Sequence, residues 1–181
     1  MRQAVTLYTD GRFWIGYVDL QSGERFSDLL NDSFVERSDK YHKFLQINDV
    51  TINSVDSKLE RRLKIAYVNK ESILIALPHD EESYTSVTNA EEPSNHPFIQ
   101  KTPIFATIVM PGYEVGGYIH CSSEQTPWSM FEEQSGFIPL LKFIPVTNVR
   151  IKVLGSSASW SDPFAAVNRE QVISFDIEAS E

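Results

Sequence analysis

An internal repeat is the feature that most constrains how this 181-residue chain can fold. Residues 5–31 align without a gap with residues 106–132, and residues 43–76 align in the same way with residues 142–175. Chance likeness between two β-rich stretches is the alternative, but a constant register with coinciding glycines is hard to obtain from strand alternation alone. The chain is therefore predicted to contain two copies of one unit. Identical pairs include Gly11 with Gly112, Gly16 with Gly117, Tyr17 with Tyr118, Asn69 with Asn168, and Glu71 with Glu170.

The repeat predicts the domain organisation. Residues 1–77 form a first β-rich unit, residues 105–181 form a second, and residues 78–104 join them. The joining segment contains Asp80-Glu81-Glu82 and Glu91-Glu92-Pro93 with few apolar residues, which is typical of an acidic linker or a long exposed loop. A unit this small buries a low fraction of its surface when alone. We therefore expect the two units to pack about a pseudo-two-fold axis.

Turn residues and apolar spacing predict the elements of each unit. Strands over residues 5–9 and 13–20 flank Asp10-Gly11, a pair that supplies the positive φ of a tight hairpin. Gly16 and Gly117 inside the second strand indicate a bulge, a bend or a close backbone approach. Phe26, Leu29 and Leu30 then share one face of a short helix.

The rest of each unit is predicted to be extended. A strand over residues 44–52 comes first, and a second hairpin over residues 64–68 and 72–77 turns at Asn69, with the same pattern around Asn168. The predicted fold class is α+β, mostly antiparallel β, with two similar small barrel-like units of the order hairpin, short helix, strand, hairpin.

Composition indicates which partners are unfavoured and in which cellular compartment the protein is expected. A net charge of −9 opposes binding that depends mainly on a phosphate backbone. Cys121 is the single cysteine, so no internal disulfide can form, which favours a reducing cytoplasmic location. The N-terminus does not resemble a signal peptide, and the longest apolar runs, such as residues 73–77, fall far short of a membrane helix. We expect a cytoplasmic protein without membrane contact.

Motifs that carry chemistry are not found in the sequence. No phosphate-binding glycine loop, zinc-binding pair or nucleophile elbow occurs, and no cofactor, metal or catalytic residue is predicted. His120 and Cys121 are neighbours, but adjacent side chains of a strand point to opposite faces and cannot readily share a proton. The candidate contacts for a ligand or partner are the basic cluster and two tryptophans, namely Arg61, Arg62, Lys64, Trp128 and Trp160.

The first copy also resembles a known kind of domain. Ile15-Gly16-Tyr17-Val18, the run Gly23 to Asn31, Phe44-Leu45 with Asn48-Asp49-Val50, and Val68-Asn69-Lys70 resemble a small bacterial β-rich domain family of unknown function, present here as two diverged copies. The shape is similar to small SH3-like or Sm-like barrels. The resemblance implies a fold and no activity.

Three hypotheses about function follow. The first is a non-enzymatic interaction or regulatory module that binds a protein partner or associates with itself, using exposed aromatic residues such as Trp14, Trp128 and Trp160. The second is nucleic-acid or nucleotide binding by the barrel-like halves through Arg61, Arg62 and Lys64, although the acidity of the chain makes nucleic acid an unfavoured partner. The third is an enzyme with an unrecognised site between the repeats.

Overall fold

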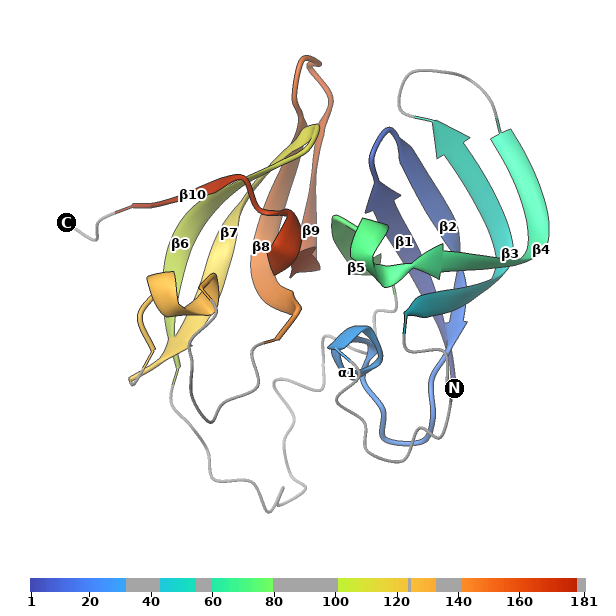
Figure 1. Ribbon diagram of the computed structural model, residues 1–181, viewed down its shortest axis with the longest axis horizontal. Coiled ribbons are helices and arrows are strands. Elements are labelled where there is room, and N and C mark those ends of the chain that lie inside the picture. Colours follow the sequence, from blue (N-terminus) through green and yellow to red (C-terminus); the bar gives the residue numbers. More distant parts are fainter. Residues whose placement is uncertain (32–42, 55–59, 80–100, 124, 133–140, 179–181) are drawn as a thin grey trace.

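The computed structural model describes residues 1–31, 43–54, 60–79, 101–123, 125–132 and 141–178. These residues form one antiparallel sheet of ten strands in the order β10-β6-β7-β8-β9-β5-β1-β2-β3-β4 (Figure 1). The prediction of an α+β fold that is mostly antiparallel β is confirmed. The sheet does not close, since β4 and β10 each pair with one neighbour in the described part of the chain.

The two halves of the chain run through the same order of elements (Figure 1). The first half holds β1 (Arg2–Thr9), β2 (Arg12–Asp19), α1 (Phe26–Asn31), β3 (Phe44–Ser54), β4 (Glu60–Asn69), the 3-10 turn η1 (Lys70–Ser72) and β5 (Ile75–Pro78). The second half holds β6 (Lys101–Met110), β7 (Tyr113–Ser122), the 3-10 turn η2 (Trp128–Met130), β8 (Phe143–Val153), β9 (Ser159–Asn168), the 3-10 turn η3 (Arg169–Gln171) and β10 (Ser174–Ile177). Most of the predicted linker lies outside the described residues.

The first hairpin of each half forms where the turn residues predict it. β1 pairs with β2 around Gly11 at φ 66°, and β6 pairs with β7 around Gly112 at φ 77°. Only glycine adopts this backbone conformation at no steric cost. The predicted short helix is also present as α1, in which Phe26, Leu29 and Leu30 are buried. In the second half a single 3-10 turn, η2, stands where the helix was expected.

A bulge beside a glycine bends the sheet in each half. The register between β2 and β3 shifts between Ile15 and Tyr17, and the register between β7 and β8 shifts between Gly116 and Tyr118. Asp49 and Asn148, on the partner strands, both have φ 51°. A Cβ added at Gly16 would lie 2.8 Å from the carbonyl oxygen of Asn48. The expected close backbone approach is therefore confirmed.

Replacing Gly117 with alanine tests this close approach. The new Cβ would lie 2.7 Å from Cγ1 of Val146 and 3.0 Å from the carbonyl oxygen of Thr147, so the bulge must move. We expect Gly117→Ala to lower the free energy of unfolding by about 2–3 kcal/mol in urea titrations. Gly116→Ala is the matched control, because its Cβ would meet only the Phe105 ring at 3.4 Å. Equal losses in the two variants would contradict the explanation.

The predicted second hairpin is wrong in both halves. β5 pairs with β1 and β10 pairs with β6, so neither pairs with the strand that precedes it in the chain. Asn69 stays extended at φ −65° and ψ 121°, and its side-chain oxygen accepts a hydrogen bond from the N–H of Glu71. This contact begins a 3-10 turn instead of a two-residue hairpin turn with positive φ. The turn sends the chain across to the far side of β1.

Each hydrophobic core contains residues of the other half. The first core gathers side chains of β1 to β5 and α1, and includes Phe143 and Ala166 from the second half. The second core gathers side chains of β6 to β9, and includes Leu74, Ile75 and Leu77 from the first half. The two halves thus exchange apolar side chains where they meet. No helix in the described part of the chain is long and apolar enough to span a bilayer.

Candidate functional site

The halves meet where β5 pairs with β9 in the middle of the sheet (Figure 1). Ile75 lies opposite Val167 and Ala76 lies opposite Ala166 in an antiparallel register. The ladder continues one residue further, because the N–H of Asn168 donates to the carbonyl oxygen of Leu74 at 2.9 Å. We call this contact, with the side chains around it, the junction.

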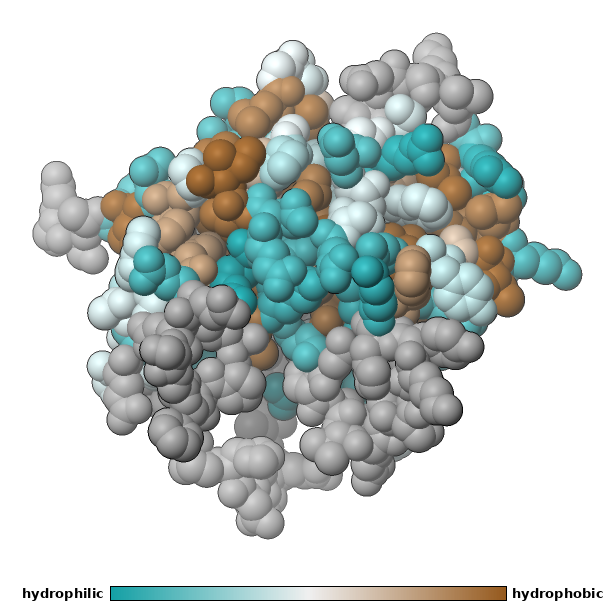
Figure 2. Space-filling model, in the orientation of Figure 1, coloured by the Kyte–Doolittle hydropathy of each residue, from teal (hydrophilic) through white to brown (hydrophobic). Residues whose placement is uncertain are grey.

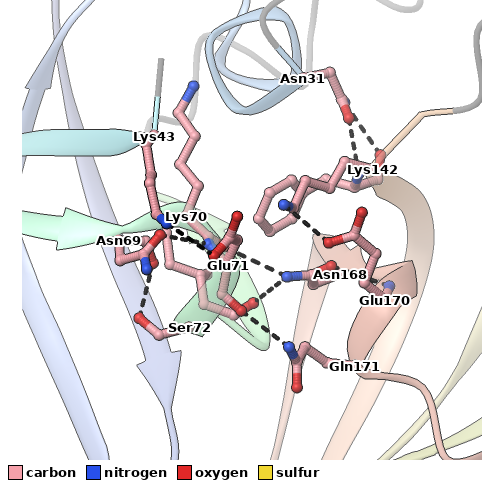
Figure 3. A network of polar contacts seen from close by, with 12 residues as sticks. Asn31, Lys43, Asn69, Lys70, Glu71, Ser72, Lys142, Asn168, Glu170 and Gln171 are labelled. Carbon is pink, nitrogen blue, oxygen red and sulfur yellow. Dashed lines mark hydrogen bonds and ion pairs between the residues drawn. The ribbon is translucent and has the colours of Figure 1, made fainter. Parts of the chain in front are cut away.

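Asn168 is the central polar residue of the junction. Its side chain is fully buried, and Nδ2 donates to the carbonyl oxygen of Ile73 at 2.8 Å and to that of Lys70 at 3.4 Å. Its Oδ1 accepts from the N–H of Glu170 at 3.1 Å. Figure 3 shows the bonds of Nδ2 reaching from the second half to the first. Both the oxygen and the nitrogen of the carboxamide therefore have hydrogen-bond partners, as a buried amide requires.

A second contact links α1 to β8. The side chain of Asn31 accepts from the N–H of Phe143 at 2.7 Å and donates to its carbonyl oxygen at 3.2 Å. Figure 3 shows Asn31 projecting from α1 toward the second half. The ring of Phe143 is 1% exposed and belongs to the same buried cluster as Leu29 and Leu30. The short helix is thus attached to the second half by both polar and apolar contacts.

Charged residues surround the junction at the surface. Lys142 and Glu170 form an ion pair at 2.9 Å, and Lys43 and Glu71 form the corresponding pair at 3.4 Å. Gln171 donates from Nε2 to the carbonyl oxygen of Glu71 at 3.0 Å, which again joins the halves. Figure 2 shows a hydrophilic band over the middle of this face. Exposed pairs of this kind add little stability individually, so the buried contacts hold the junction together.

An aromatic cluster also joins the two halves. The ring of Tyr8 stacks on Trp160 at 5.3 Å and meets Tyr113 edge-on at 5.7 Å, so one ring of the first half contacts two of the second. Burial raises the pKa of Tyr8 above its ordinary value, and nearby Tyr113 and Asp162 raise it further. Tyr8 therefore keeps its proton in the folded chain when an unfolded tyrosine would lose it.

This pKa predicts a loss of stability at high pH. Because the folded-state pKa of Tyr8 is raised, its contribution is complete below the unfolded pKa of 10.0 and is lost as pH rises beyond it. We expect the free energy of unfolding to fall by at most about 1.4 kcal/mol per pH unit above about pH 10. Chemical unfolding of the wild type and Tyr8→Phe at several pH values measures this. A Tyr8→Phe variant with the same pH dependence as the wild type would contradict it.

The structure places the predicted basic cluster on an edge of the sheet. Arg61, Arg62 and Lys64 are exposed residues of β4, within a strand that begins earlier than predicted. Arg62 Nε pairs with the carboxylate of Glu60 at 2.7 Å. Arg62 and Lys64 also line an open groove of about 440 Å³ that Asp49 lines too.

The two predicted tryptophans lie in the second half, apart from the basic cluster on β4. Trp128 is 56% exposed in η2 and contacts the ring of Phe175 at 5.7 Å. Trp160 is half-buried and packs against Tyr8 within the fold. A separate open groove of about 500 Å³ lies between the halves, where the third hypothesis expects a site, and is lined by Thr9, Arg12, Leu74, Ser72, Pro111 and Gln171 among others.

His120 and Cys121 point to different surroundings, as adjacent strand residues do. The imidazole of His120 bonds to the hydroxyl of Thr147 at 2.8 Å, and burial lowers its pKa. Cys121 is buried against Met130, and burial raises the pKa of its thiol. No set of three or more His, Cys, Asp or Glu side chains in the described part of the chain is arranged to hold a metal ion.

The two ends of the sheet expose apolar side chains. At the β4 end, Phe44 is 44% exposed and Tyr67 is 62% exposed, and at the β10 end Ile173 is 68% exposed. We call the surface around Phe44, Tyr67 and Asn69 the β4 edge, and the surface from Val172 to Ile177 the β10 edge. Sequence reasoning expected the two units to pack together but identified neither the edges nor the residues of the junction, because it treated Asn69 and Asn168 as turn residues only. Their identity in the aligned positions was the one available signal.

Known proteins give no guide to the function of this chain, so the functional argument rests on the geometry of the junction and of the two edges. The chain matches no model of a protein family, no curated protein and no solved structure.

Proposed function

We propose that the protein is an interaction module made of two copies of one small barrel-like β unit, and that it binds a protein through the β4 edge. The observation that carries the proposal is the edge strand β4, which pairs with β3 alone in the described part of the chain, with Phe44 and Tyr67 exposed beside it. The outer side of an edge strand presents a row of N–H and C=O groups that a strand of another protein can pair with. Exposed aromatic rings add apolar contact to such pairing.

The distribution of charge along β4 supports this use of the edge. Its first part carries Arg61, Arg62 and Lys64, and charged side chains on an edge strand oppose pairing with another strand. Its second part, from Ile65 to Asn69, carries no charge and exposes Ile65 and Tyr67. The segment suited to strand addition is therefore residues 65–69.

The repeat of strand order supports the duplicated organisation. The order β5-β1-β2-β3-β4 in the first half matches β10-β6-β7-β8-β9 in the second, and both halves have a bulge with a positive φ at the aligned Asp49 and Asn148. The strand order and the position of the bulges both agree with the alignment of the two halves of the sequence. In this proposal the duplication supplies a rigid, two-unit sheet that holds the β4 edge open for a partner.

A photo-crosslinking experiment tests the proposal. A benzophenone amino acid placed at Tyr67 is expected to crosslink the chain to a protein in its native cells. The same amino acid at Ile15 is the matched control, since Ile15 is 42% exposed but lies on β2, away from the edge. Mass spectrometry identifies the product. Crosslinks of equal yield at both positions, or none at Tyr67, would contradict a protein-binding role for the β4 edge.

Nucleic-acid or nucleotide binding is a second candidate because Arg62 and Lys64 line the same groove. It ranks second, since Asp49 lines that groove and Glu60 already pairs with Arg62. Binding of this kind weakens steeply with added salt and depends on Arg61 and Arg62. Titration of a labelled oligonucleotide into the wild type and an Arg61→Ala, Arg62→Ala variant at two salt concentrations decides between the candidates.

A further inference from the structure

We propose that the partner of the β4 edge is a second copy of this chain, whose β10 pairs antiparallel with β4 so that molecules associate head to tail. The inference rests on the proposed function and names its partner. The junction inside each molecule is the model for this contact. There β5 of the first half pairs with β9 of the second, and by strand order β10 corresponds to β5 as β4 corresponds to β9.

The register of the contact follows from the junction. Ile75 opposite Val167 and Ala76 opposite Ala166 correspond, through the aligned positions, to Ser174 of one molecule opposite Val68 of the next, and Phe175 opposite Tyr67. The contact between molecules would therefore stack two aromatic rings where the junction holds two alanines. Aromatic pairs across antiparallel strands add favourable contact.

In three aligned pairs of residues, one member is buried at the junction and the other is exposed at an end of the sheet. Leu74 is 3% exposed at the junction, whereas the aligned Ile173 at the β10 edge is 68% exposed. Ala166 is 1% exposed, and the aligned Tyr67 is 62% exposed.

Phe143 and the aligned Phe44 repeat the pattern, at 1% and 44% exposed. The side chains that the junction buries thus have apolar counterparts at the two ends of the sheet. A head-to-tail contact with the geometry of the junction covers both ends at once.

The backbone N–H of Asn69 is oriented to pair with a strand added at the β4 edge. In the second half, Arg169 N–H donates to Lys142 at 2.8 Å, and the neighbouring Asn168 N–H faces the other side and donates to Leu74. In the first half, Lys70 N–H donates to the carbonyl oxygen of Lys43 at 2.9 Å. By the alternation of an antiparallel ladder, the N–H of Asn69 faces away from β3, toward the side of β4 that pairs with no described strand.

The side chain of Asn69 makes one of the two kinds of hydrogen bond that Asn168 makes. Its Oδ1 accepts from Glu71 N–H at 3.1 Å, as Oδ1 of Asn168 accepts from Glu170. Nδ2 of Asn168 continues across the junction to Ile73, whereas Nδ2 of Asn69 has no hydrogen bond to any described residue. In the proposed contact it donates to the carbonyl oxygen of Val172 of the second copy, the residue aligned with Ile73.

The contact joins two different surfaces, so it is heterologous and leaves a free β4 edge and a free β10 edge until a ring closes. The junction is held within one chain, but the contact between molecules must overcome the entropy lost on association. The assembly is therefore expected to depend on protein concentration. Its formation needs no ligand.

Analytical ultracentrifugation of the full chain tests the association. Between about 1 µM and about 300 µM the average mass is expected to rise from 20.6 kDa to at least twice that value. Tyr67→Lys and Ile173→Lys, each damaging one edge with a charge, are each expected to remain monomeric. Ile15→Lys, on β2 and 42% exposed, is the matched control and is expected to associate like the wild type.

Mixing the two variants tests the head-to-tail geometry. The Tyr67→Lys molecule keeps its β10 edge and the Ile173→Lys molecule keeps its β4 edge, so an equimolar mixture is expected to form a one-to-one dimer and nothing larger. A contact of β4 with β4 would instead give a dimer of Ile173→Lys alone, without any one-to-one dimer of the two variants in the mixture. That result, or a wild type that stays monomeric at the highest concentration, would overturn the proposal.

Hydrogen exchange of the wild type provides a test that does not depend on folded variants. The amide of Asn69 is expected to exchange at least about 10-fold more slowly at high than at low protein concentration, while the edge-distant amide of Gly11 stays unchanged. Exchange at Asn69 that is independent of concentration would overturn self-association. A crosslink from Tyr67 to a different protein, with a monomeric wild type, would retain the interaction module and reject the second copy as its partner.

Discussion

Replacing Phe143 with alanine is expected to lower the free energy of unfolding by about 3–5 kcal/mol, the largest effect among the single substitutions considered. The ring is 1% exposed and lies in the core of the other half with Leu29 and Leu30. Its removal leaves a cavity beneath α1, and the six-residue helix is too short to be stable without tertiary packing. Urea unfolding followed by tryptophan fluorescence measures the loss.

Phe44→Ala is the matched control, since Phe44 is the aligned residue of the first half and is 44% exposed. We expect it to cost about 1 kcal/mol or less when the protein is studied at about 1 µM, where association between molecules is minimal. A loss for Phe143→Ala no larger than that for Phe44→Ala would show that the ring does not hold the two halves together.

Asn168→Ala is expected to cost about 3 kcal/mol. The substitution removes the bond from Nδ2 to the carbonyl of Ile73, the weaker bond to Lys70, and the cap on the N–H of Glu170. Removing one partner of a buried bond leaves the other unsatisfied, and a lost cap adds about 1 kcal/mol. The position is fully buried, so water cannot readily replace the lost contacts.

Comparison with Asn69→Ala distinguishes the stability that the cap contributes from the stability that the junction contributes. Asn69 caps Glu71 at 3.1 Å in the same way as Asn168 caps Glu170, but makes no side-chain contact with the other half among the described residues. Its loss is expected to be about 1 kcal/mol, the value of the cap alone. Thermal unfolding of both variants gives the difference. Equal changes in melting temperature would mean that Asn168 stabilises its turn and contributes nothing to the junction.

Local backbone signals in the sequence predicted local structure well. Asp10-Gly11 and the aligned Gly112 predicted the first hairpin of each half, and the spacing of Phe26, Leu29 and Leu30 predicted α1. Gly16 and Gly117 indicated the close approach beside each bulge. In these cases the property that determines the structure, a positive φ, a missing Cβ or a periodic apolar face, belongs to a few neighbouring residues.

Pairing between distant segments was not predictable in this way. The turn at Asn69 was interpreted as a hairpin because strand-like segments flank it, yet β5 pairs with β1 and β9. Whether a strand returns to its neighbour or crosses to another depends on the direction of the chain after the turn and on which edge is free. Trp160, predicted as a contact for a ligand or partner, packs on Tyr8 of the other half, a contact that depends on which distant strands come together.

By itself, the sequence determined an antiparallel β-rich fold, the first hairpin turn of each half, the bulges and the short helix of the first half, because these depend on local conformational preference. The tertiary structure alone decided that β5 and β9 join in one sheet, that Phe143 and Asn168 are buried there, and that the aligned Phe44 and Asn69 lie at an open edge. The physical reason is that aligned residues have the same local preferences but different neighbours. The sheet pairs β9 with β5 and leaves β4 and β10 as its two ends in the described chain.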